Sequence, residues 1–99
     1  MATKKRHNYN FNYILVFYDI GEKRVGKVFK ICKKYLVPFQ KSVFRGEITP
    51  ANIIKLKLEL EKVIDPDYDF VTFMKFIGEH QIFEENIGID PNPEYENFI

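Results

Sequence analysis

The 99-residue chain has no tryptophan, a single cysteine and no long apolar run. Because Cys32 stands alone, the chain can form neither an intramolecular disulfide nor a zinc site built from cysteines. No apolar run approaches the roughly 20 residues that a bilayer span requires. The basic residues 1–8 are followed by polar residues instead of the apolar stretch of a signal peptide. We therefore expect a cytoplasmic protein that does not interact with membranes.

The sequence also lacks the common motifs of nucleotide binding and of nucleophilic catalysis. Gly21 and Gly26 are isolated, and neither lies in a glycine-rich phosphate loop. No Ser-His-Asp or Cys-His arrangement is evident, and we expect both His7 and His80 on the surface. Cys32 falls on the apolar side of a predicted helix and is expected to be a small core residue.

The composition is typical of one folded domain with an aromatic-rich core. Hydrophobic residues make up 45% of the chain, charged residues 29%, and aromatic residues 16%, from ten Phe and six Tyr. The charges are segregated: residues 1–64 carry 14 Lys and Arg against 5 acids, and residues 65–99 carry one Lys against 9 acids. Such segregation indicates either two different partners, a polyanion being one, or two halves that neutralise each other in the fold.

The spacing of apolar residues predicts six elements. They are a central strand over residues 12–20 buried on both faces, a helix over 22–36, an extended segment over 38–48, a helix over 50–64, a strand over 68–77, and a short last strand within 80–89. A bend or bulge at Gly46 could divide the extended segment into two short strands. The helix at 50–64 should begin with Thr49 as N-cap and Pro50 in its first turn. Its buried residues should be Ile53, Leu56, Leu60, Val63 and Ile64, with Leu58 widening the stripe.

This order predicts an α+β sandwich of the ferredoxin-like, split-βαβ type, with two helices on one face of an antiparallel sheet. Residues 1–11 would be a flexible basic arm, 12–78 the ferredoxin-like domain, and 79–99 a C-terminal strand and acidic tail. The other sheet face should be apolar and uncovered. Because monomers rarely expose such a face, we expect a homodimer that buries it.

Two features could carry function. Asp19 ends the first strand, where a carboxylate either caps the following helix or binds a metal ion. The first helix carries cations along one side, with Glu22 as its only acid: Lys23, Arg24, Lys27, Lys30 and Lys34, joined by Lys33. This basic stripe is either a solvated helix face or a surface that follows a phosphate backbone.

Three segments together resemble the CRISPR-associated protein two family, the small subunit of the spacer-acquisition machinery. They are the strand over 16–20 (VFYDI), the helix start over 23–28 (KRVGKV) and the segment 40–46 (QKSVFRG). The later positions Asp69-Phe70-Val71 also fit, and the resemblance covers roughly residues 12–78.

The resemblance implies a ferredoxin-like homodimer formed through the sheet faces. Asp19 matches an aspartate near the two-fold axis that holds a divalent metal, which implies one Mg²⁺ or Mn²⁺ per dimer. Arg24 matches a basic position of the first helix, and three positions match the surroundings of the dimer cleft: Tyr18, Ser42 and Phe44. The implied activity is metal-dependent endonuclease cleavage of single-stranded RNA or double-stranded DNA.

Other functions are also compatible with the sequence. The resemblance also implies a dimeric scaffold for the integrase subunit of the CRISPR adaptation complex, which needs nucleic-acid binding without catalysis. A ferredoxin-like ribonuclease toxin of the VapD kind shares the fold and the strand-end aspartate. The acidic and apolar residues 80–99 are suited to adding a strand to a neighbouring chain.

Overall fold

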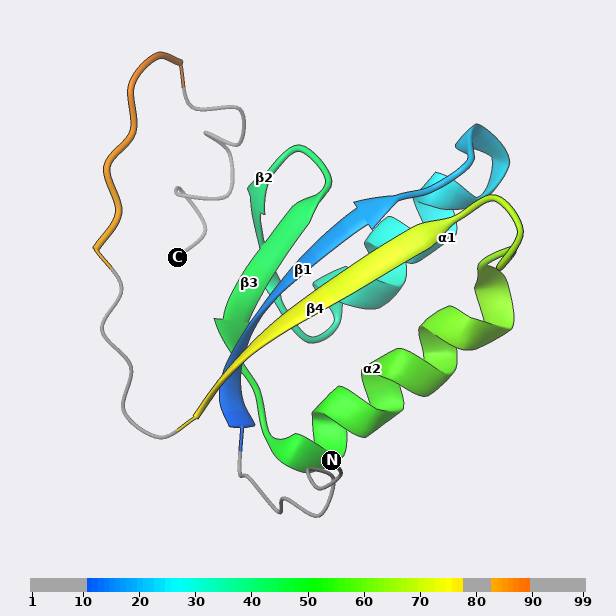
Figure 1. Ribbon diagram of the computed structural model, residues 1–99, viewed down its shortest axis with the longest axis horizontal. Helices are drawn as coiled ribbons and strands as arrows, with labels where there is room; N and C mark the ends of the chain where they lie inside the picture. The colour runs from blue at the N-terminus through cyan, green and yellow to red at the C-terminus, as the bar shows by residue number, and fades with distance from the viewer. Residues whose placement is uncertain (1–10, 78–82, 90–99) are drawn as a thin grey trace, which may run out of the picture.

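The computed structural model describes residues 11–77 and 83–89. Its elements follow the predicted order (Figure 1). They are β1 (Phe11–Asp19), α1 (Glu22–Lys33), β2 (Val37–Gln40), β3 (Val43–Glu47), α2 (Pro50–Val63) and β4 (Phe70–Ile77).

The four strands form one sheet in the order β2-β3-β1-β4, and every neighbouring pair is antiparallel. The first strand is central, as predicted, because it pairs with both β3 and β4. This strand order arises because α1 and α2 each carry the chain across the sheet before the next strand begins. The architecture is the α+β, ferredoxin-like sandwich that the sequence predicted.

Both helices pack on one face of the sheet and share one core with it. The first helix contributes Val28 and Cys32, which are fully buried against β1 and β3. Burial raises the pKa of the Cys32 thiol to about 12, so this cysteine is an unreactive core residue, as expected. The largest fully buried side chain is Phe44, whose ring lies 5.2 Å from that of Phe29.

The second helix begins where the sequence predicted. The Thr49 hydroxyl accepts a hydrogen bond from the Asn52 backbone N–H at 3.1 Å, and Pro50 occupies the first turn. The prediction for Leu58 was wrong, because its side chain is 53% exposed. It lies two residues from both Leu56 and Leu60, a spacing that turns it to the opposite side of the helix.

The extended segment forms two short strands, as the sequence allowed, but they are divided before Gly46. The chain reverses between β2 and β3 at Ser42, which adopts a φ of +63°. Gly46 lies within β3, paired with Ile14. Glycine is required there because φ is +154° and an added Cβ would lie 3.3 Å from Leu36 Cδ2.

The sheet face opposite the helices, called the open face below, is apolar and uncovered by the described residues. Along β1 and β4 the side chains alternate between the two faces. Buried Ile14, Val16 and Tyr18 point to the helices, whereas Leu15, Phe17 and Asp19 point away. The prediction of a first strand buried on both faces was therefore wrong for a single chain. From β4 the open face gains Phe70, Thr72, Met74 and Phe76.

The last predicted strand is absent from the part of it that the structure describes. Residues 80–82 lie outside the described residues, and residues 83–89 carry no strand. This segment runs beside the hairpin side of the sheet (Figure 1), and Glu84 forms an ion pair with Arg45 of β3. Its apolar side chains Phe83, Ile87 and Ile89 are exposed. Within the described chain, neither helix has the length and apolar character needed to cross a membrane.

Candidate active site and nucleic-acid interface

Asp19 ends β1 with its side chain on the open face. It is the register partner of Phe70, the first residue of β4, and it is exposed. The N-cap of α1 is Gly21, and no side chain caps that helix. The structure therefore excludes the capping role that the sequence allowed for Asp19. Within residues 11–77 and 83–89, no hydrogen bond or ion pair engages its carboxylate, which leaves it available to a ligand.

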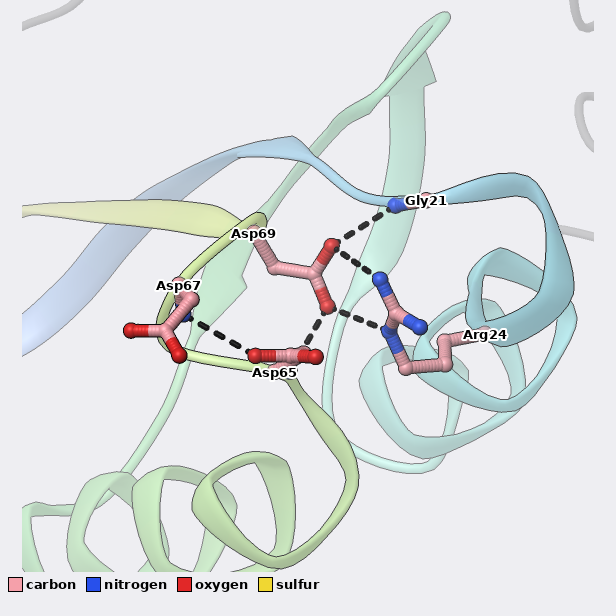
Figure 2. Close-up of polar contacts among 5 residues, drawn as sticks. All are labelled: Gly21, Arg24, Asp65, Asp67 and Asp69. Carbon is pink, nitrogen blue, oxygen red and sulfur yellow. Dashed lines mark hydrogen bonds and ion pairs between the residues drawn. The ribbon is translucent and has the colours of Figure 1, made fainter.

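A second aspartate lies close by and is fully engaged. The Asp69 carboxylate accepts hydrogen bonds from the Gly21 N–H at 2.8 Å and from the Asp65 N–H at 2.8 Å. Arg24 donates two more, from Nε at 2.6 Å and from Nη2 at 2.9 Å. Figure 2 shows the guanidinium of Arg24 facing both carboxylate oxygens. We call these four residues the carboxylate clamp; they join the start of α1 to the connection between α2 and β4.

The clamp shifts the ionisation of both charged groups. The hydrogen bonds from Arg24, and then those from the backbone N–H groups of Asp65 and Gly21, hold the pKa of Asp69 well below its usual range. The same pairing raises the pKa of Arg24. Because the Asp69 side chain is completely buried, its charge depends on these partners for stabilisation.

The clamp corrects the role that the sequence gave to Arg24. We expected its guanidinium on the basic stripe, in contact with a phosphate backbone. Instead its side chain is mostly buried and forms a two-point pair with Asp69. This fork-to-carboxylate geometry commits Nε and Nη2, two of the three nitrogens that could otherwise bind phosphate. Arg24 therefore serves the fold in this structure.

Three exposed lysines of the basic stripe have no ion-pair partner among the described residues. Lys23, Lys27 and Lys30 are exposed on α1, and none forms an ion pair with another described residue. Lys34, also expected on this surface, is paired with Glu59 of α2 at 2.5 Å. We use the name lysine stripe for Lys23, Lys27 and Lys30. Three exposed cations about one helical turn apart suit contacts to successive phosphates of a nucleic acid.

The three residues expected around a cleft occupy different environments. Tyr18 and Phe44 are buried on the helix-facing side of the sheet, with ring centroids 6.1 Å apart. They are core residues, because alternation along each strand turns them away from the open face that Asp19 occupies. Ser42 lies at the same end of the sheet as Asp19, since its carbonyl accepts the Tyr18 N–H at 3.0 Å.

A metal ion would find one carboxylate at this site. Among the residues that the structure describes, no three His, Cys, Asp or Glu side chains are grouped as metal ligands. Two of the aspartates that precede β4 are committed otherwise, since Asp69 accepts four hydrogen bonds and Asp65 accepts the Asp67 N–H at 3.0 Å. Mg²⁺ is bound in proteins by one or two carboxylates with waters and phosphate oxygens. Asp19 therefore fits such an ion best where a second copy brings a second Asp19.

Sequence reasoning missed Asp69 as a site residue. The sequence did contain a signal for it. Residues 65, 67 and 69 place three carboxylates directly before a strand, whereas a single turn requires fewer. The partner could not be found in the same way, since Arg24 is 45 residues away along the chain.

The fold and the site together define a class of protein: a small ferredoxin-like domain with an apolar open face, an exposed strand-end carboxylate and a lysine stripe. Comparison with protein families then identifies the group. The family model for CRISPR associated protein Cas2 matches residues 12–84, and the chain belongs to this family.

Individual relatives agree with this assignment. The chain is 59% identical over 78 residues to a CRISPR-associated endoribonuclease Cas2 of Thermodesulfovibrio yellowstonii, covering 79% of this chain and 89% of that protein. It is 40% identical over 78 residues to the CRISPR-associated endoribonuclease Cas2 of Thermotoga maritima, covering 79% and 90%. A crystal structure of Cas2 superposes with a TM-score of 0.74 at 34% identity, covering 83% of this chain and 92% of the other.

Proposed function

We propose that the chain is a metal-dependent endonuclease that cleaves single-stranded RNA or double-stranded DNA during CRISPR adaptation and acts as a homodimer. The observation that carries this proposal is the exposed, unengaged carboxylate of Asp19 at the end of the central strand. The names of the relatives support it, because they are endoribonucleases.

The open face supports the dimer. Several of its large apolar side chains are exposed in the single chain, including Phe70 at 69% and Met74 at 51%. Burying such side chains against a second copy would remove apolar surface from water, which is the main driving force for association. Asp19 lies on the same face as these residues, so a two-fold axis near the strand end would bring two Asp19 carboxylates together.

The two Asp19 carboxylates of the dimer would hold one Mg²⁺ or Mn²⁺ ion. When bound, such an ion lowers the pKa of its water and compensates the charge that develops on the phosphate. The protein's own part is to place the carboxylate and to hold the substrate. The lysine stripe would bind the phosphate backbone without regard to base sequence.

A second function is favoured by a specific feature of the site. Among the described residues no group of three or more His, Cys, Asp or Glu side chains could hold a metal ion, whereas three lysines of α1 are exposed and without an ion pair. This balance suits a dimeric scaffold that supports a duplex beside the integrase subunit of the adaptation complex. The exposed apolar residues Phe83, Ile87 and Ile89 would then be available for docking to another chain.

A cleavage assay with Asp19→Ala distinguishes the two functions. Wild type and variant are incubated with single-stranded RNA and with duplex DNA, in Mg²⁺, in Mn²⁺ and in chelator, with dimerisation checked by light scattering. Metal-dependent cleavage that falls roughly a hundredfold or more in the variant supports the nuclease. Cleavage that persists in the variant would contradict the Asp19 site. Duplex binding without cleavage by either protein would leave the scaffold as the function.

A further inference from the structure

The carboxylate clamp adjoins the strand end that carries Asp19. Gly21, whose N–H is bonded to Asp69, lies two residues beyond Asp19. On the other side, Phe70 pairs with Asp19 and directly follows Asp69. The backbone of Asp19 is thus held by sheet pairing before the junction and by the clamp after it. Only Ile20, which packs against the core, lies between these two attachments.

The clamp replaces the local restraint that the helix start lacks. No side chain caps α1 from within its own segment, and the first turn begins at Gly21. A buried carboxylate from the α2–β4 connection instead accepts the N–H of the N-cap residue Gly21, and its negative charge is favourable beside a helix N-terminus. Without this distant acceptor, the turn from β1 into α1 would lose its bond to the rest of the fold.

We infer that Arg24 and Asp69 are positioning residues for Asp19: their clamp fixes the junction between β1 and α1, and so fixes where the Asp19 carboxylate stands. This inference rests on the proposed nuclease function. Arg24 acts through Asp69 and Gly21, and the lysine stripe alone contacts the nucleic acid. Partners that orient a functional group contribute about ten- to a hundredfold to activity in comparable sites.

The test compares Arg24→Gln with two matched variants. Lys27→Gln removes an exposed cation one turn further along α1. Ile53→Ala weakens the core near the start of α2, which joins the opposite end of the sheet, where the Ile48 N–H bonds the Asn12 carbonyl. Each purified protein is assayed for kcat and KM on single-stranded RNA with Mn²⁺, for the salt dependence of RNA binding in chelator, for amide hydrogen exchange and for thermal unfolding. Arg24→Lys, which keeps the charge but loses the fork, replaces Arg24→Gln if that variant does not fold.

Arg24→Gln should lower kcat about ten- to a hundredfold with KM and the salt slope of binding unchanged. The Gly21 amide should exchange faster, while the amides at the start of β1 remain protected. Lys27→Gln should instead weaken binding and reduce the salt slope by about one, with kcat retained. Ile53→Ala should lower the melting temperature and leave kcat intact at a temperature where it is folded.

Three results would overturn the inference. A raised KM and a shallower salt slope in Arg24→Gln would make Arg24 a phosphate contact. An equal loss of kcat in Ile53→Ala would make the effect one of general stability. Unchanged kcat and Gly21 exchange in Arg24→Gln would show that the clamp does not hold the junction. If the wild type cleaves nothing, the nuclease proposal fails by itself, and the exchange of Gly21 alone decides whether the clamp holds this strand end.

Discussion

Asp19 and Asp69 lie at the same end of the sheet, yet the fold treats them in opposite ways. Asp69 is buried and accepts four hydrogen bonds, two from the backbone and two from Arg24. Asp19 is exposed on the open face, and no group among the described residues engages its carboxylate. The comparison teaches that a carboxylate at a strand end becomes structural when donors converge on it, and stays available for chemistry when the strand directs it outward.

The sharpest test of this contrast is to neutralise each aspartate in turn. Asp69→Asn should destabilise the fold well beyond the range of about 0.5 kcal/mol that ordinary surface substitutions cover, because an amide cannot accept from all four donors. Asp19→Asn should stay within that range, since its side chain has no described partner. Urea unfolding at pH 7 measures the free energy of unfolding of both variants. A large loss of stability in Asp19→Asn would contradict the contrast between the two aspartates.

The pH dependence of stability tests the contrast between Asp19 and Asp69 further. The pKa of Asp69 is lower in the folded chain than in the unfolded chain, so the unfolded state takes up a proton first as the pH falls. The stabilisation from Asp69 is therefore fully present above the ordinary Asp pKa of about 3.9 and is lost as the pH falls through the lower folded value. Wild-type stability should fall more steeply below pH 4 than that of Asp69→Asn. Parallel curves for the two proteins would contradict the clamp.

The smallest effect comes from a pair of glycines near the clamp. At Gly21 an added Cβ would lie 2.4 Å from Arg24 Nη2, so Gly21→Ala should displace the guanidinium from Asp69 and lower stability. At Gly26, in the same helix, an added Cβ meets nothing within 4 Å. Gly26→Ala should raise the free energy of unfolding by about 0.5–1 kcal/mol, because alanine favours the helix. Thermal unfolding of both variants measures these changes in stability. Equal effects of the two substitutions would show that Gly21 is no more constrained than Gly26.

Local patterns in the sequence predicted most of the fold. The periodicity of apolar residues placed both helices and the first and last strands, and Thr49-Pro50 marked the start of α2 because that pair satisfies a helix N-terminus locally. The hairpin turn at Ser42 was missed because a non-glycine residue there adopts a positive φ, which no propensity signals. Leu58 was predicted to be buried because it is apolar, although its position on the helix turns it away from the buried side.

The candidate site was only half predictable. Asp19 stood out because a carboxylate directly follows a continuous apolar strand. Arg24 was assigned to the basic stripe because its sequence neighbours are cations, whereas in the fold its position in the first turn brings it to a carboxylate 45 residues away. Tyr18 and Phe44 were placed around a cleft on resemblance, and strand alternation puts both in the core.

By itself, the sequence determined the ferredoxin-like order of elements, the apolar open face and the lysines of α1, because these depend on spacing within short stretches of chain. Only the tertiary structure decided which charges are free. The pairing of Arg24 with Asp69 and of Lys34 with Glu59 joins residues from different elements, and burial of the Asp69 side chain requires both ends of that network at once. Such partners are set by long-range packing, and the local periodicity of the sequence carries no information about it.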